Sequence, residues 1–438
     1  MSTKWHLSEY NISAKIPEED RWVMVNTFKG TCTPLNAAYL YAMTELNDLD
    51  EDTPILKKLA KFGIITDIDE RAALSSIALL VPGFPHAVNL TICPTLGCNF
   101  DCPYCFENHN SSKMDAKTMD GVIKFAEKML DASGAKNLSV TWFGGEPLLA
   151  CDVIESLSDR LIKLCEDRNI KYSAGVITNG YLLDQKTADM LEKAMVSSAQ
   201  ITLDGIGSTH DMTRHLAGGG ATFDRITGNL RNVKIPFKVN IRHNLHTKNV
   251  DESVALCDYI KELADKSGND LIYYGKEVSG NEVADSRGST ISAANSADCA
   301  NAGLKIDAEN FGGGSGRFCG ANSLWNVCID AEGRLGKCWE IVDKPEHSFG
   351  NVNDWNPMNP IASSSDPDNL TKYINTTGAL NDAECLDCIW LPECRGGCCQ
   401  RRLTTGKSCV PYKDDPESFV REVYAVRKKR LEQKKNKQ

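Results

Sequence analysis

The stretch TLGCNFDCPYCFE, residues 95–107, holds three cysteines separated first by three residues and then by two. These are Cys98, Cys102 and Cys105. Three thiolates can bind three of the four irons of a 4Fe–4S cube, which leaves the fourth iron free to bind another molecule. A structural zinc site usually takes four ligands in paired spacings, so the unpaired trio favours an iron–sulfur cluster.

Strand-like and helix-like segments alternate around this stretch, from residue 86 to about residue 300. Strands are predicted at 87–92, 137–143, 170–177, 197–203, 237–243 and 270–274, and amphipathic helices at 119–130, 153–166, 187–195, 223–233 and 252–264. Six such repeats predict an α/β fold with a parallel sheet and outer helices, short of a closed eight-strand barrel. The cysteines follow the first strand, at the edge where parallel sheets place their chemistry.

The cysteine trio, with Tyr104 just before its last member, resembles the radical S-adenosylmethionine (SAM) enzymes. In that family SAM chelates the open iron, and the fold is a partial (β/α)6 TIM barrel. A GGEP stretch at the end of the second strand hydrogen-bonds the SAM amino group there. The matching residues here are Gly144, Gly145, Glu146 and Pro147. Taken alone, these glycines equally fit any tight strand-to-helix turn.

Polar residues close the later predicted strands. They are Thr178 and Asn179, then Thr202 and Asp204, and then Arg242. Similar positions in the family meet the ribose and carboxylate of SAM, so the resemblance implies cofactor contacts. Asn-Gly and Asp-Gly pairs are also common turn formers, and turn chemistry therefore remains open for each residue.

A second cysteine array lies near the C-terminus, and its spacing matches the seven-cysteine SPASM pattern of radical SAM enzymes that modify peptides. The resemblance implies two further clusters, giving three 4Fe–4S clusters in all. One set would be Cys319, Cys338 and Cys398, completed by Cys328 or left with an open iron; the other would be Cys385, Cys388, Cys394 and Cys409. A pair of zinc ribbons is the alternative, because Cys-x-x-Cys is also zinc spacing.

The chain divides into three predicted blocks and a tail. Residues 1–85 predict a winged-helix-like module, with strands around Lys29-Gly30, helices at 37–49 and 54–62, and Gly63 as a helix cap. This module resembles the leader-recognition domains of peptide maturases, which bind a precursor by strand addition. The barrel would occupy 86–300, the SPASM domain 301–412, and a charged helix or tail 413–438.

Composition narrows the function classes. The formal net charge is −10, which argues against general binding to nucleic acid or to an anionic membrane. We find no apolar run long enough to span a bilayer and no secretory N-terminus, which predicts a cytoplasmic protein. The chain has 18 cysteines; in the cytosol these favour metal sites over disulfides, and oxygen-sensitive clusters would suit an anaerobic setting.

The resemblance implies a peptide maturase. An electron, from a donor such as flavodoxin or ferredoxin, would lead to SAM cleavage at the Cys98/Cys102/Cys105 cluster, and a 5′-deoxyadenosyl radical would take hydrogen from a precursor peptide. We predict an intramolecular crosslink, thioether in preference to carbon–carbon, and identify no acid/base residue.

Two alternatives remain open. One is a sulfatase-maturing or epimerising radical SAM enzyme; sulfatase maturases carry aspartate directly after the second SPASM cysteine, where this chain has Trp339. The other is a non-catalytic binding or electron-transfer protein stabilised by zinc or iron–sulfur clusters.

Overall fold

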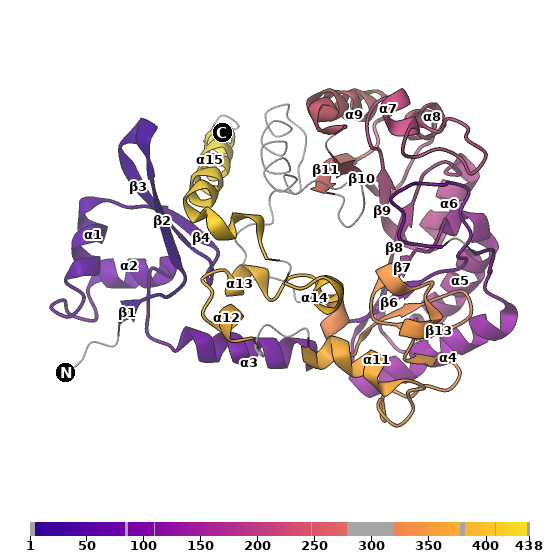
Figure 1. Cartoon of the computed structure of the whole chain (residues 1–438), viewed down its shortest axis with the longest axis horizontal. Coiled ribbons are helices and arrows are strands. Elements are labelled where there is room, and N and C mark those ends of the chain that lie inside the picture. Colours follow the sequence, from indigo (N-terminus) through magenta and orange to yellow (C-terminus); the bar gives the residue numbers. More distant parts are fainter. Residues whose placement is uncertain are drawn as a thin grey trace. The chain divides into compact units, whose positions relative to one another are not determined.

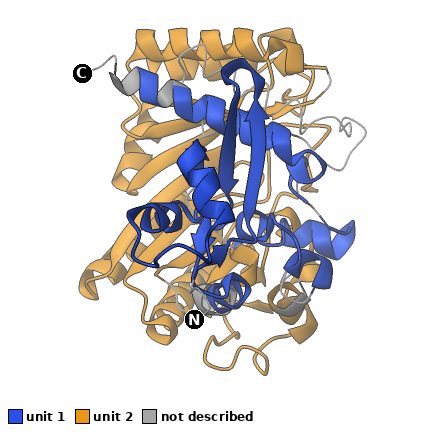
Figure 2. Cartoon of the chain, turned by 90° about the vertical axis from the view of Figure 1, so that its left-hand side faces the viewer, with its two compact units in different colours: residues 1–82, 309–319, 376–438 blue, residues 83–308, 320–375 orange. Residues whose placement is uncertain are grey.

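The computed structural model describes residues 5–83, 86–108, 110–246, 248–277, 319–376, 382–407 and 409–435. The chain forms two compact units (Figure 2). The smaller contains residues 1–82, 309–319 and 376–438, and the larger contains 83–308 and 320–375. The functional division predicted at residues 85, 300 and 412 stays a prediction.

The larger unit is built on a sheet with the strand order β11-β10-β9-β8-β7-β6-β12-β13-β14 among the described residues. All neighbours from β6 to β11 pair in parallel. Their bounds are β6 Val88–Ile92, β7 Asn137–Trp142, β8 Lys171–Thr178, β9 Val196–Thr202, β10 Lys238–Leu245 and β11 Leu271–Glu277. The predicted partial (β/α)6 barrel is therefore confirmed.

Helices cover one face of this parallel sheet (Figure 1). They are α4 Ala116–Ser133, α5 Cys151–Asp167, α6 Gln185–Lys193, α8 Phe223–Asn232 and α9 Ser253–Ser267, with the short α7 Ser208–Asp211. Apolar strand residues alternate with polar ones, and the apolar set packs with the helices in one core. Half-buried polar side chains such as Asn89, Thr91, Ser139 and Thr141 take the other positions. The strands thus present a polar face away from the helices.

Short elements extend and connect the sheet. β12 Asn326–Ile329 pairs in parallel with β6, and β13 Arg334–Gly336 and β14 Gly350–Asn351 continue it in antiparallel fashion. The sequence did not predict these three strands. The remaining short helices of this unit are η2 Pro147–Ala150, η3 Val250–Glu252, η5 Gly320–Asn322, η6 Trp339–Ile341, η7 Pro345–His347, α11 Pro367–Thr371 and η8 Lys372–Thr376.

The smaller unit begins with a strand pair and a three-stranded antiparallel sheet. β1 His6–Leu7 pairs with β5 Ile65–Thr66, while β2 Asn11–Ile16, β3 Arg21–Asn26 and β4 Thr31–Pro34 form the sheet, with η1 Pro17–Glu19 after β2. The helices are α1 Ala37–Thr44, α2 Pro54–Phe62 and α3 Glu70–Gly83. Gly63 ends α2 at φ 76°, as predicted. The sequence reasoning missed β1, β2 and α3, and α1 ends earlier than residue 49.

The C-terminal segment completes the smaller unit. It contains α12 Ala383–Leu386, α13 Leu391–Cys394, α14 Cys399–Thr404, η10 Pro411–Asp414 and α15 Pro416–Lys435. Helix α15 lies against β2 and β3, where Val420 is fully buried beside Ala14 and Val23. Arg427 Nη2 also donates to the carbonyl oxygen of Gly30 at 2.7 Å. The far C-terminal helix therefore covers the N-terminal sheet.

In the described part of the chain, no helix combines the length and the apolar character that crossing a membrane requires.

Candidate functional site

The loop that carries Cys98, Cys102 and Cys105 follows β6 and is fixed along its backbone. Gly97 accepts a hydrogen bond from the Glu146 backbone N–H at 2.8 Å, and Asp101 N–H donates to the carbonyl of His215 at 3.1 Å. Isolated β-bridges join Thr95 to Lys113 and Phe100 to Leu216. These contacts come from three separate parts of the chain, so the protein itself contributes much of what holds the loop in place.

The three thiols of this loop lie within electrostatic reach of one another. Cys98 and Cys102 are half-buried and Cys105 is exposed. Burial raises the pKa of Cys98 to about 12. A bound metal offsets this cost, because metal coordination deprotonates thiols. The converging thiols therefore fit a cluster held by three cysteines.

The backbone of the GGEP stretch packs directly against the cysteine loop. Gly144 has φ 116°, and a Cβ there would lie 2.2 Å from the carbonyl oxygen of Thr95. A Cβ on Gly145 would lie 2.3 Å from the carbonyl oxygen of Gly97. Both positions therefore require glycine, because real Cβ atoms do not approach backbone oxygens so closely. Pro147 follows as the first residue of η2 and is buried.

Glu146 is fully buried and bonded within the protein. Its carboxylate accepts hydrogen bonds from the Leu148 N–H at 3.0 Å, the Thr178 hydroxyl at 2.7 Å and the Asn179 N–H at 2.7 Å. Burial raises its pKa, and these donors oppose the rise. Asn179 Nδ2 then donates to Asn99 Oδ1 of the cysteine loop at 2.8 Å. The structure thus joins three predicted residues, while their contacts with SAM remain predictions.

Tyr104 anchors the other end of the loop. Its hydroxyl donates to the buried Asp204 carboxylate, and accepts from Arg214 Nη1 at 2.9 Å and Asn244 Nδ2 at 3.2 Å. Arg242 Nε donates to Asn244 Oδ1 at 2.7 Å. Tyr104, Asp204 and Arg242 therefore belong to one network at the ends of β9 and β10. Thr202 is the last residue of β9 and is also buried.

An acidic pair beside the cysteine loop was missed by the sequence analysis. The Asn108 N–H donates to Asp343 Oδ2, which brings Asp343 next to Glu107. Burial and the charge of Asp343 together raise the pKa of Glu107 to about 8. The printed sequence offers no signal for this pair, because 235 residues separate the two bonded positions.

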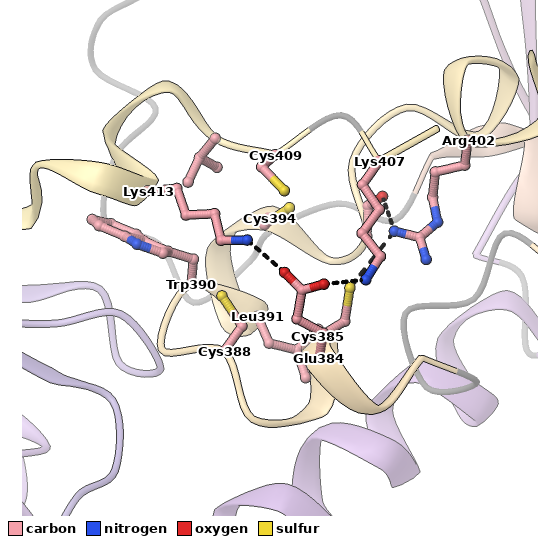
Figure 3. Close-up of a pocket in the computed structure, with 12 residues that line it drawn as sticks. Glu384, Cys385, Cys388, Trp390, Leu391, Cys394, Arg402, Lys407, Cys409 and Lys413 are labelled. Carbon is pink, nitrogen blue, oxygen red and sulfur yellow. Dashed lines mark hydrogen bonds and ion pairs between the residues drawn. The ribbon is translucent and has the colours of Figure 1, made fainter. Parts of the chain in front are cut away.

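Four of the predicted C-terminal ligands line a single pocket (Figure 3). They are Cys385, Cys388, Cys394 and Cys409, and the pocket encloses about 400 Å³, open solvent included. Across the described residues, no three His, Cys, Asp or Glu side chains are gathered tightly enough to hold one metal ion. A tetrahedral zinc site needs such a tight group, whereas a cube spreads its ligands around four irons. The four thiols around this pocket are the ligand number that either a cube or a zinc site takes, and an iron–sulfur cluster here stays a prediction.

Three cations border the same pocket. Arg402 Nη1 lies 3.6 Å from Cys385 Sγ and donates to it. Lys407 and Lys413 reach into the rim and pair with Glu384 at 2.6 Å and 2.7 Å (Figure 3). Nearby positive charge favours thiolates, the form that binds iron. The electrostatics of this pocket therefore suit an anionic cluster.

The other predicted set is divided between the two units. Cys319 and Cys398 belong to the smaller unit, and Cys338 and Cys328 to the larger. Cys328 lies on β12, 7% exposed, in an apolar cluster with Cys93 and Phe143. A cluster shared by these cysteines stays a prediction.

Comparison with known proteins identifies the larger unit. Residues 92–285 match the family model of the radical SAM superfamily. The radical SAM cyclopropyl synthase TigE of Paramaledivibacter caminithermalis is 32% identical over 110 residues, which is 22% of this chain and 23% of TigE. The cysteine-type anaerobic sulfatase-maturating enzyme of Clostridium perfringens is 29% identical over 30% of this chain and 36% of its own length. The chain thus spans only about a quarter to a third of these two relatives.

Two solved structures share the fold. Native anSMEcpe with bound AdoMet and Cp18Cys peptide aligns over 78% of this chain and 99% of its own, with a TM-score of 0.58 and 20% identity. SuiB of Streptococcus suis, bound to S-adenosylmethionine, aligns over 90% and 95%, with a TM-score of 0.51 and 15% identity. At these identities the similarity concerns the fold alone.

Proposed function

We propose that this chain, which carries a radical SAM domain over residues 92–285 and is an enzyme of that superfamily, matures a ribosomally made precursor peptide by forming an intramolecular crosslink. The expected bond is a thioether in preference to a carbon–carbon bond. The N-terminal module would bind the leader of the precursor. Flavodoxin or ferredoxin is the expected type of electron donor.

The observation that carries this proposal is the four-cysteine pocket and its place in the smaller unit. The segment around Cys388 and Cys394 packs on the N-terminal sheet through Trp390. The Thr27 hydroxyl donates to the Ile389 carbonyl at 2.8 Å, and Arg71 pairs with Asp387 at 2.7 Å. An auxiliary cluster at this pocket would therefore be built onto the module expected to recognise the peptide.

The residues of the larger unit divide the proposed work. Cys98, Cys102 and Cys105 would hold the cluster whose open iron takes SAM. When bound there, the cluster and SAM would supply the chemistry of reductive SAM cleavage to methionine and a 5′-deoxyadenosyl radical, which could take a hydrogen atom from a substrate C–H bond. Gly144 and Gly145 allow close backbone approach, and Glu146 and Tyr104 fix the loop. These residues would hold the reacting groups to within about 1 Å of the geometry that the reaction needs.

The similar proteins support the substrate class. The solved anSMEcpe structure contains both AdoMet and a peptide. TigE is named as a cyclopropyl synthase, so a radical SAM relative forms new bonds. The sulfatase-maturating relatives favour a second candidate, oxidation of a protein side chain. Against that candidate, the position after Cys338 is Trp339, which is 43% exposed and lies 5.7 Å from the Phe143 ring.

Mass spectrometry tests the proposal. A short peptide encoded beside this gene would be incubated anaerobically with reconstituted enzyme, SAM and a reductant. Loss of two hydrogens together with 5′-deoxyadenosine formation supports a crosslink, and fragmentation locates it. An unchanged mass, with deuterium incorporated from deuterated water, indicates epimerisation. Full iron content without 5′-deoxyadenosine argues for a non-catalytic iron–sulfur protein, and zinc in place of iron argues for a zinc-stabilised one.

A further inference from the structure

A row of aromatic rings borders the cysteine loop on the larger unit. The Phe106 and Phe143 rings are stacked with centroids 6.4 Å apart, and Trp339 continues the row 5.7 Å from Phe143. Phe106 is 42% exposed and Trp339 is 43% exposed, whereas Phe143 between them is buried. The row therefore has two partly exposed rings at its ends, and one of them, Phe106, directly follows Cys105.

The acidic pair comes from the same segments as the two outer rings. Glu107 follows Phe106, and Asp343 lies four residues after Trp339, in the turn that follows η6. Asp343 is only 5% exposed. Asp343 Oδ1 and Glu107 Oε2 are both buried and find no hydrogen-bond partner among the described residues. Two carboxylates with unsatisfied oxygens at one place are costly, so this arrangement calls for a ligand.

The cation on this segment does not supply that ligand. Lys344 Nζ donates to the carbonyl oxygen of Glu340 at 3.1 Å instead. Within the described part of the chain, Asp343 accepts a hydrogen bond from the Asn108 N–H, which is neutral. The charge of Lys344 acts on Glu107 from a distance, but among the described residues neither Glu107 Oε2 nor Asp343 Oδ1 has a hydrogen-bond partner.

We propose that Glu107 and Asp343 bind a cationic side chain of the peptide substrate, lysine or arginine, whose stem lies along Phe106 and Trp339. An ammonium or guanidinium group would donate hydrogen bonds to both unpartnered oxygens. The face of an aromatic ring packs well against the methylene stem of such a side chain and attracts its positive charge. Glu107 as a whole is half-buried, so part of its side chain is accessible to solvent.

The statement that the cationic side chain belongs to a peptide rests on the proposed function. The binding test does not depend on that function. The probes are N-acetyl-lysine methylamide and the uncharged N-acetyl-norleucine methylamide, and binding to the reconstituted holoenzyme with SAM is followed by ligand-observed NMR. We expect the lysine probe to bind at least tenfold more tightly than the norleucine probe. Asp343→Asn and Glu107→Gln should each abolish this preference and leave norleucine binding unchanged.

A matched control and a stability measurement separate binding from a structural role. Glu346→Gln removes an exposed carboxylate from the same segment and should keep the preference. Asp343→Asn keeps the oxygen that accepts from Asn108 and removes an unpaired buried charge, so its melting temperature should not fall. A lower melting temperature for Asp343→Asn, or equal affinity for the two probes, would overturn the assignment.

The same experiment distinguishes the two proposals. Lysine-probe binding that depends on Asp343, in an enzyme that modifies no peptide, keeps this assignment and removes the maturase proposal. Peptide crosslinking by an enzyme that shows no preference for the lysine probe keeps the maturase proposal and removes this assignment.

Discussion

Replacing Gly145 with alanine should displace the cysteine loop. The new Cβ would lie 2.3 Å from the carbonyl oxygen of Gly97 and 2.7 Å from that of Leu96. Carbon–oxygen contacts ordinarily begin at about 3.3 Å, so the loop must retreat by about 1 Å. Both oxygens belong to the backbone, and no side-chain rotation can relieve the clash.

The displacement should affect chemistry more than stability. Overpacking of this kind costs about 1–3 kcal/mol of unfolding free energy. A 1 Å misplacement near the reacting groups can cost about 100-fold in rate. We therefore expect Gly145→Ala to fold, and to form 5′-deoxyadenosine from SAM about 100-fold more slowly. Chromatography of the products, iron analysis and thermal unfolding would measure these three effects on one preparation.

The matched control is Gly228→Ala in α8. No described atom lies within 4 Å of the Cβ that this change would add. The control should keep the wild-type rate and gain up to about 1 kcal/mol from helix propensity. If Gly145→Ala retains full iron and cleaves SAM within twofold of the wild-type rate, the close packing of GGEP against the loop does not control the chemistry.

Three further predictions concern other parts of the chain. Cys409→Ser should contain less iron than the wild type, by the content of one cluster, when measured by elemental analysis. Cys151→Ser, which can keep the hydrogen bond from residue 151 to the Leu148 carbonyl, should lose no iron, and equal iron in the two variants would exclude Cys409 as a ligand. Glu146→Gln should lower the free energy of unfolding by about 1–3 kcal/mol in denaturant titrations, because its amide nitrogen would face a site of hydrogen-bond donors; unchanged stability contradicts this. Val420→Ala, at a fully buried position of α15, should lower the free energy of unfolding by about 1.5–2.5 kcal/mol in the same titration. Leu431→Ala, at a position of that helix that is 62% exposed, should change it by no more than about 0.5 kcal/mol, and similar losses in both variants would contradict packing of α15 on the sheet.

The parallel strands were predictable because their signals are local. Each of β6 to β11 alternates apolar and polar residues and ends at polar or glycine-containing turns, so pattern alone locates it. Strands β12 to β14 were missed because they are two to four residues long. Such strands exist through pairing, as when Cys328 aligns with Thr91 of β6. No local pattern encodes that register.

In the site, too, residues with a local sequence signal were predicted, whereas contacts between residues far apart in the sequence were not. The cysteine ligands were predicted from spacing, and GGEP from its position after a strand. The contact of Arg214 with Tyr104 joins residues 110 positions apart, a separation that no local pattern spans. The pairing of Glu107 with Asp343 was not predicted at all, since it depends on how the η6 region returns to the cysteine loop.

The packing of α15 on the N-terminal sheet has a consequence for synthesis in the cell. About 400 residues separate the end of β2 from the start of α15, and at about 5–20 residues per second a ribosome needs roughly 20–80 s to make them. Throughout that interval the apolar side chains of β2 and β3 lack their partner helix. We therefore expect the nascent N-terminal segment to expose apolar surface during synthesis, and a fragment ending near residue 83 should aggregate unless α15 is supplied in trans.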